Sequence, residues 1–206
     1  MATLTEAMYL PAVENNPDAQ GAYSEVIRIA RSTGAHLPQI WHLFAFKPEA
    51  TKHLERFTHE VMRGPSPLSP GLRELIATYT SGRNECPFCR KSHAAVAADL
   101  LGSREKVEAA LSDANSPLLT REEAALLRFV GKVTRAPWDI GPSDIEALHE
   151  AGWGDDAIYD AVTVCAMFNF FNRWILATGV HPMSDEAHQA AVARMAKGYI
   201  RTPESL

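Results

Sequence analysis

The sequence predicts an all-α protein, and two observations carry this prediction. Apolar residues recur at spacings of three and four, the period of one helix face, whereas strand-like alternation does not recur. Helix start signals also recur, in which serine or threonine precedes proline or stands three residues before glutamate. We therefore expect one helix after another along the 206 residues, which is a length typical of a single domain.

Three helices are expected in the N-terminal third of the chain. Apolar spacing indicates two short helices over residues 23–32 and 37–46, and glycine and proline separate them. Pro48 begins a third helix that reaches about residue 62, because proline is well tolerated in a first helical turn.

Residues 63–70 read Arg-Gly-Pro-Ser-Pro-Leu-Ser-Pro and cannot be helical throughout. Each proline lacks an N–H donor and clashes with the preceding helical turn. We expect residues 1–62 to form an N-terminal helical arm that packs on a core of residues 63–206, with the whole chain forming a single compact unit.

Start signals mark the helices of this core. Ser69 precedes proline and reads as an N-cap, while Thr120 and Ser143 each have a glutamate three residues later, the pattern of a capping box. A long buried helix is expected from Asp155 to about Thr178.

Residues 86–91 (CPFCRK) and 169–174 (NFFNRW) share a rhythm. If the two segments correspond, the match pairs Cys86 with Asn169, Cys89 with Asn172 and Arg90 with Arg173. An internal two-fold helical repeat and two unrelated amphipathic helices both explain this pattern.

Composition excludes several classes of partner. Lysine and arginine number 20 against 25 aspartate and glutamate residues, giving a net charge of −5, and the basic residues are scattered, so no nucleic acid is expected to bind. No signal-like start is visible, and no apolar run reaches the ~18 residues of a membrane span. We expect a cytoplasmic protein without a membrane partner.

The three cysteines are too few for a disulfide scaffold, but two of them are spaced as CxxC.

Chemistry is expected between Glu74 and His93. Pro87 favours a helix start, which places Cys86 and Cys89 at a helix N-terminus, where free backbone N–H groups and the helix dipole stabilise a thiolate. His93 lies four residues beyond Cys89 on the same face, and an imidazole can accept and return a thiol proton near neutral pH. Glu74 could orient that imidazole, although a first-turn glutamate also suits the helix dipole alone.

A glutamate, a cysteine twelve residues later and then xxCxxxHis resemble the signature of the AhpD-like and carboxymuconolactone decarboxylase superfamily. The flanking segments LSPGLREL and AAVAADLLG are similar to its helices, so the resemblance covers roughly residues 35–180. Residues 166–174, AMFNFFNRW, resemble the branch called peroxidase-related enzymes. The AhpD-like helical fold is therefore expected.

The resemblance implies a thiol-dependent (alkyl)hydroperoxide reductase. Cys89 would be the peroxidatic thiol and Cys86 the resolving thiol, with His93 and Glu74 as the proton relay. The substrate would be a small peroxide, and an external dithiol or thiol-protein would reduce the resulting disulfide, without another cofactor or a metal. A homo-oligomer, as a dimer, trimer or hexamer, is also implied. Phe88 departs from alkylhydroperoxidases proper, which often have histidine between the cysteines, and makes the pocket more apolar.

Two alternatives remain open. Cys86, Cys89 and His93 could hold Zn²⁺ with one further ligand, from among His53, His59 and Glu74. The chain could instead be a non-redox enzyme of the decarboxylase or isomerase type, although family members that decarboxylate a lactone generally lack the cysteine pair.

The long apolar helix also carries three polar residues, Asn169, Asn172 and Arg173. They could line the pocket or satisfy one another's hydrogen bonds at an interface.

Overall fold

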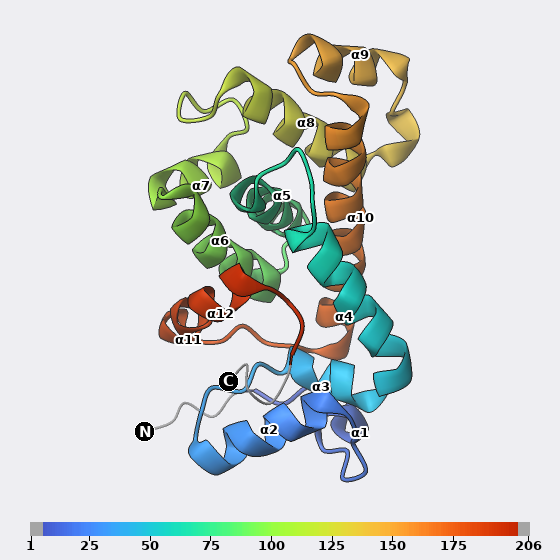
Figure 1. Ribbon diagram of the computed structural model, residues 1–206, viewed down its shortest axis with the longest axis vertical. Coiled ribbons are helices and arrows are strands. Elements are labelled where there is room, and N and C mark those ends of the chain that lie inside the picture. Colours follow the sequence, from blue (N-terminus) through green and yellow to red (C-terminus); the bar gives the residue numbers. More distant parts are fainter. Residues whose placement is uncertain (1–5, 202–206) are drawn as a thin grey trace.

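The computed structural model describes residues 6–201, and these residues form helices joined by short loops (Figure 1). No strand is present in this range. The predicted all-α class is therefore confirmed.

Four helices make up the N-terminal part: α1 (Pro11–Glu14), α2 (Ala22–Thr33), α3 (Ile40–Phe46) and α4 (Pro48–Arg63). The last three match the predicted segments closely. α1, α2 and α3 lie together at one end of the molecule, and α4 leads from them toward the body (Figure 1).

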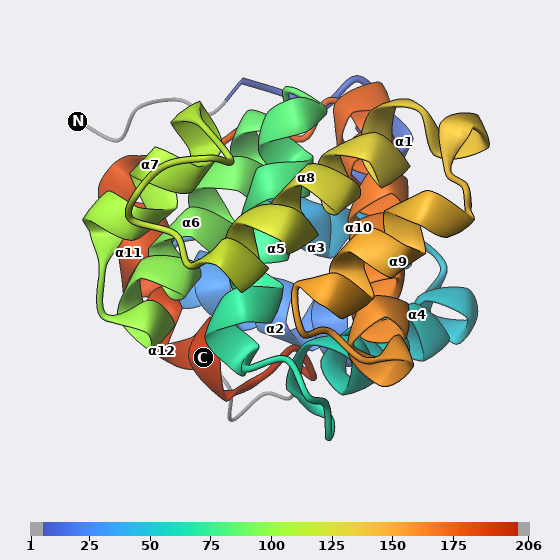
Figure 2. The same ribbon diagram turned by 90° about the horizontal axis from the view of Figure 1, so that it is seen from above.

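Helix α5 (Pro70–Arg83) occupies the middle of the body and packs against α6 (Pro87–Leu101), α8 (Arg121–Arg135) and α10 (Asp155–Thr178) (Figures 1 and 2). Every residue of α5 from 71 to 81 is buried, so this helix has no solvent-facing stripe. Its Leu75 and Ile76 are fully enclosed, together with Phe168 of α10. Glu74, the predicted site residue on α5, is thus held in a packed core.

Caps explain where several of these helices begin. The Ser69 hydroxyl accepts the backbone N–H of Leu72 at 3.1 Å. Thr120 and Glu123 form the expected capping box, with contacts of 3.2 and 2.9 Å. Both predicted starts are confirmed.

The start predicted at Ser143 is wrong by two residues. Helix α9 (Pro142–Glu150) begins at Pro142, whose fixed φ suits a first helical position. Asp144, in place of Glu146, reaches back to accept the backbone N–H of Gly141 at 2.8 Å.

Hydrogen bonds to α5 and α10 hold the end of α4 and the proline-rich loop that follows it. Arg73 of α5 donates to the carbonyl oxygens of Val61 at 3.0 Å and Gly64 at 2.9 Å, and Ser66 donates to Asp160 of α10 at 2.5 Å. Helix α4 also packs on α5 and α10. The last helix of the predicted arm is thus part of the packed body, while the boundary at residue 62 stays a prediction.

The structure contains further helices that the sequence pattern did not single out: α7 (Arg104–Ser112), α11 (Asp185–Ala190) and α12 (Val192–Lys197), with a 3-10 turn at Pro137–Asp139. Both α11 and α12 pack on α6. They carry the chain back over the segment that holds the cysteines. Within the described residues, no helix combines the length and apolarity that crossing a membrane requires.

Candidate functional site

A tight turn between α5 and α6 places the cysteine pair. Glu85 has φ of +52°, a left-handed conformation that L residues other than asparagine and aspartate rarely adopt. The turn brings the backbone N–H of Cys86 to the carbonyl oxygen of Ser81 at 2.9 Å. Cys86 is the N-cap of α6 and Pro87 its first helical residue, as the sequence predicted.

The two thiols are free, buried and close enough to share a proton. The exposed fraction is 0% for Cys86 and 2% for Cys89. A hydrogen bond from the Cys89 thiol lowers the pKa of Cys86 to about 7, and the backbone N–H groups of Cys89 and Phe88 contribute. Burial raises the pKa of Cys89, and the neighbouring Cys86 sulfur raises it further. The hydrogen bond from Cys89, with a further contribution from the helix end, therefore favours a thiolate on Cys86, whereas the family resemblance implies Cys89 as the peroxidatic thiol.

Polar side chains lie behind the sulfurs. Asn172 donates to the Ser81 hydroxyl at 3.0 Å and accepts from Asn84 at 2.9 Å, and its amide lowers the pKa of both cysteines. Asn169 also accepts from Asn84, at 3.0 Å, but it is not hydrogen-bonded to Cys86 or Cys89. Arg173 is exposed and donates to Asn169. Only Asn172 of this predicted trio acts on the sulfurs.

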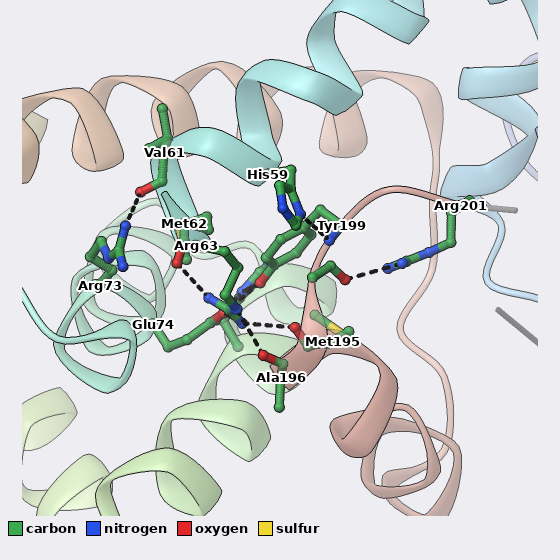
Figure 3. A network of polar contacts seen from close by, with 12 residues as sticks. His59, Val61, Met62, Arg63, Arg73, Glu74, Met195, Ala196, Tyr199 and Arg201 are labelled. Atoms are coloured by element: carbon green, nitrogen blue, oxygen red, sulfur yellow. Dashed lines mark hydrogen bonds and ion pairs between the residues drawn. The ribbon is translucent and has the colours of Figure 1, made fainter. Parts of the chain in front are cut away.

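Glu74 is the centre of a buried polar network (Figure 3). Its Oε2 lies 2.6 Å from Nδ1 of His93, and its Oε1 accepts from Arg63 at 2.5 Å and from the Tyr199 hydroxyl at 2.5 Å. Arg63 also donates to the carbonyl oxygens of Met195 and Ala196 on α12. The network thus joins α4, α5, α6 and the C-terminal segment.

This network fixes the proton on His93. Burial alone raises the pKa of Glu74, but His93, Arg63 and Tyr199 lower it by more, so the carboxyl is ionised and can only accept. Nδ1 of His93 must then be the donor to Glu74. In the neutral imidazole Nε2 is consequently left with a lone pair and can act as a base.

A cavity of about 720 Å³, solvent at its mouth included, adjoins these groups. Cys89, Phe88 and His93 line it, but Cys86, Asn169, Asn172 and Arg173 do not. Most of the remaining wall is aromatic or aliphatic, as the phenylalanine between the cysteines suggested. Within residues 6–201 no hydrogen bond joins His93 to either sulfur. The Cys89 thiol and the His93 imidazole instead both face the cavity.

The alternative zinc site is not assembled. Among the described residues, no three histidine, cysteine, aspartate or glutamate side chains are grouped so that they could hold a metal ion. Glu74 is already bonded to Arg63 and His93, and His59 accepts the backbone N–H of Tyr199 at 3.3 Å. The proposed ligand set therefore gains no support from the geometry.

Sequence reasoning missed Arg63 and Tyr199. Arg63 was assigned to the linker, and Tyr199 lies 125 residues beyond Glu74 without a motif around it. It also missed His188 of α11, which contacts the Ser92 hydroxyl at 3.0 Å behind the cavity wall. No local pattern marks these contacts, because that of Arg63 with Glu74 depends on how α4 packs on α5, and those of Tyr199 and His188 depend on how the C-terminal segment folds back.

Residues 48–131 match the model of the Carboxymuconolactone decarboxylase family. An uncharacterized peroxidase-related protein from Silicibacter sp. TM1040 is similar in structure, with a TM-score of 0.73 and 29% identity over 90% of this chain and 98% of that chain. No curated protein sequence matches the chain.

Two further solved structures show likeness of fold alone. An alkylhydroperoxidase AhpD core, an uncharacterized peroxidase-related protein from Ralstonia eutropha JMP134, has a TM-score of 0.70 and 23% identity over 80% of this chain and 86% of that chain. The debrominase Bmp8 has a TM-score of 0.60 and 21% identity over 83% of this chain and 90% of that chain.

Proposed function

We propose that the chain is a cysteine-based peroxidase of the AhpD-like carboxymuconolactone decarboxylase superfamily, which reduces an organic hydroperoxide through Cys89 and Cys86. The superfamily and a peroxidase-related structural neighbour support an enzyme of this general kind. One observation carries the finer proposal. Cys89 lines a cavity together with His93, while Cys86 lies behind it within hydrogen-bonding reach.

The geometry favours Cys89 as the thiol that meets the peroxide, since it alone of the pair lines the cavity. Its raised pKa does not oppose this role. The Cys89 thiol can donate to the Cys86 sulfur, so a resting Cys86 thiolate can take the Cys89 proton when the substrate arrives. Cys86 then becomes a thiol, the form needed in the next step.

In the first chemical step the Cys89 thiolate attacks the terminal oxygen of the hydroperoxide. The S–O bond forms as the O–O bond breaks, which oxidises the sulfur to a sulfenic acid and releases an alkoxide. His93 holds the proton that left the dithiol when Cys86 ionised, and it delivers this proton from Nε2 to the alkoxide to give the alcohol. Glu74 orients the imidazole throughout.

In the second step the Cys86 thiol condenses with the Cys89 sulfenic acid. A disulfide forms and one water molecule leaves. An external dithiol or thiol-protein then donates two electrons and two protons to restore both thiols by thiol–disulfide exchange. Each turnover therefore converts one hydroperoxide and one dithiol into an alcohol, water and a disulfide.

The test is a single turnover with reduced protein and cumene hydroperoxide, followed by assays of cumyl alcohol and free thiols. We expect the wild-type protein to lose two thiols, as an intramolecular disulfide, for each alcohol formed. Cys86→Ser should react more slowly, because Cys89 loses the thiolate that takes its proton, and should stop at a sulfenic acid that dimedone traps on Cys89. Cys89→Ser should form no alcohol.

Cys165→Ser is the matched control, since this third buried cysteine does not line the cavity, and it should behave as the wild type. Alcohol formation that survives Cys89→Ser would contradict the proposal. A wild-type protein that loses no thiol would favour the non-redox decarboxylase or isomerase class instead.

We also expect a homo-oligomer. Apolar side chains are left exposed along α3 and α10, with exposed fractions of 40% for Phe46 and 49% for Phe170, and both line one apolar groove. Such a surface favours contact with another protein surface. Light scattering after size exclusion should give a mass of at least twice the 22.6 kDa of one chain, and a monomer at micromolar concentration would contradict this expectation.

A further inference from the structure

Two arginines from the C-terminal segment, Arg194 and Arg201, line the cavity that holds Cys89 and His93. Arg194 belongs to α12, and its guanidinium lies 5.4 Å from the ring centre of Trp41. The neighbouring Arg63 also carries a guanidinium, but its charge is matched by the Glu74 carboxylate at 2.5 Å. Among residues 6–201 no carboxylate forms an ion pair with either of the two cavity arginines.

Arg201 is held by backbone carbonyl oxygens instead of a counter-ion. Its Nη1 donates to Gly198 at 3.1 Å and to Ile200 at 3.2 Å, and the residue is 7% exposed. Its buried Nε has no hydrogen-bond partner in the described part of the chain. The cavity wall thus contains an enclosed donor with unused capacity.

One carboxylate, Glu55 of α4, also lines the cavity. Its Oε1 accepts the backbone N–H of Arg201 at 2.6 Å and is not bonded to that residue's guanidinium. Two guanidiniums and one carboxylate leave this part of the wall with one formal positive charge. Burial lowers the pKa of Arg194 to about 10 and also lowers that of Arg201, as expected for cations removed from water without a full counter-ion.

The rest of the cavity suits an apolar molecule. Its aromatic lining consists of Tyr23, Trp41, Phe44, Phe88, Phe168 and Phe171. A mostly apolar cavity with a few convergent polar groups is the usual form of a small-molecule site. Here the convergent groups are the thiol, the imidazole and the two guanidiniums.

We propose that the cavity takes an amphipathic ligand with an apolar body and a single carboxylate, which Arg194 and Arg201 bind while the reactive group faces Cys89. A planar carboxylate matches the donor geometry of guanidinium, and one negative charge balances the one positive charge of the wall. A dianion such as a phosphate monoester would leave an excess negative charge beside Glu55. The proposal rests on the peroxidase function, for which it names the substrate class: an apolar hydroperoxide that carries a carboxylate.

Binding can be measured apart from catalysis with an unreactive pair of probes, 4-phenylbutanoate and the neutral 4-phenylbutanamide, by isothermal titration calorimetry. We expect the wild-type protein to bind the carboxylate about tenfold more tightly than the amide, as a charge-assisted hydrogen bond would give. Arg194→Met and Arg201→Met should each bring the two affinities to within about twofold. Equal affinities in the wild type, or a preference that survives both substitutions, would overturn the proposal.

Two further variants control for charge. Arg56→Met removes an exposed arginine of α4 outside the cavity and should keep the preference for the carboxylate. Glu55→Gln keeps an acceptor for the Arg201 N–H while removing the negative charge, and it should strengthen carboxylate binding by a few-fold. Weaker carboxylate binding in Glu55→Gln would contradict the charge argument.

Turnover separates this inference from the peroxidase proposal. With linoleic acid hydroperoxide and its methyl ester as substrates, the acid should have the lower KM, and Arg194→Met should raise the KM for the acid by more than the KM for the ester. If no hydroperoxide is consumed while 4-phenylbutanoate still binds through the arginines, the peroxidase function fails and the ligand class stands. If hydroperoxides are consumed without preference for the acid, the ligand class fails alone.

Discussion

The Glu74 carboxylate and the His93 imidazole are 2.6 Å apart. They belong to the consecutive helices α5 and α6, which the short turn at Glu85 joins. Glu74 is fully buried, and its charge is balanced by Arg63, which reaches it from α4. One carboxylate therefore orients the candidate base and also holds α4 against α5. Substitutions at this residue should affect both stability and chemistry.

Glu74→Gln should lower the free energy of unfolding by about 3 kcal/mol, because the substitution leaves the buried Arg63 cation without its counter-charge. Urea denaturation would measure the loss. Glu49→Gln is the matched control, since that exposed carboxylate of α4 pairs with Lys52 at the surface and its loss should destabilise the protein far less than Glu74→Gln. Equal losses in the two variants would show that burial of the Glu74 pair adds nothing.

Tyr199→Phe tests the contact that sequence reasoning missed. The change removes the hydroxyl that donates to Glu74 at 2.5 Å but keeps the ring, over which Arg63 lies at 5.1 Å. With a less constrained carboxylate, we expect kcat for cumene hydroperoxide to fall about tenfold while KM changes less than about twofold.

The exposed Tyr159 of α10 supplies the control for this measurement, and Tyr159→Phe should leave both constants as in the wild type. A matching fall in KM and kcat for Tyr199→Phe, or no fall in kcat, would mean that the hydroxyl does not position the Glu74–His93 pair for proton transfer.

The sequence was sufficient for the helices whose boundaries are set locally. Ser69 and Thr120 cap helices with their own side chains, and Pro87 begins α6, so these starts depend on a few neighbouring residues. The helix start predicted at Ser143 was wrong because Asp144, and not Glu146, is the capping partner, and because Pro142 occupies the first helical position. Local signals therefore predict that a helix exists better than they predict its first residue.

The candidate site was predictable only in part, for a related reason. Glu74, Cys86, Cys89 and His93 lie within 20 consecutive residues, so their spacing alone places them on two adjoining helices. Tyr199 joins them through a C-terminal segment whose docking depends on long-range packing, which periodicity does not reveal. The order of the two thiol pKa values likewise depends on burial and on the direction of one S–H group.

The lower pKa of Cys86 depends first on the hydrogen bond from the Cys89 thiol. The thiolate absorbs near 240 nm, so a pH titration can follow it even though both sulfurs are buried. We expect one thiol of the wild-type protein to ionise with an apparent pKa of about 7, and Cys89→Ala to raise that value toward the ordinary range of a thiol.

Cys165→Ala should leave this titration unchanged, because burial raises the pKa of Cys165 and that thiol contributes no signal near neutral pH. An apparent pKa that is the same in Cys89→Ala as in the wild type would show that the Cys89 S–H does not stabilise the Cys86 thiolate.

His188 should make the folded protein less stable in mild acid. Burial lowers its pKa from 6.5 to about 4, and Nε2 has no hydrogen-bond partner in the described part of the chain. Between pH 6.5 and 4 the unfolded chain therefore binds a proton at this residue that the folded protein does not bind. The resulting stability is fully present above pH 6.5 and is lost as the pH falls toward 4.

Urea denaturation at pH 7 and at pH 4.5 would measure this loss. His188→Gln keeps a polar partner for the Ser92 hydroxyl but cannot take up the proton, so its stability should fall less between the two pH values than that of the wild type. The exposed His149, which pairs with Asp155, provides the comparison, and His149→Gln should retain the wild-type slope. The ring of His188 packs edge-on against Phe88 of the cavity wall, so we expect protonation of His188 to loosen the cavity before the core unfolds. An equal loss of stability between the two pH values in the wild type and in His188→Gln would contradict this account.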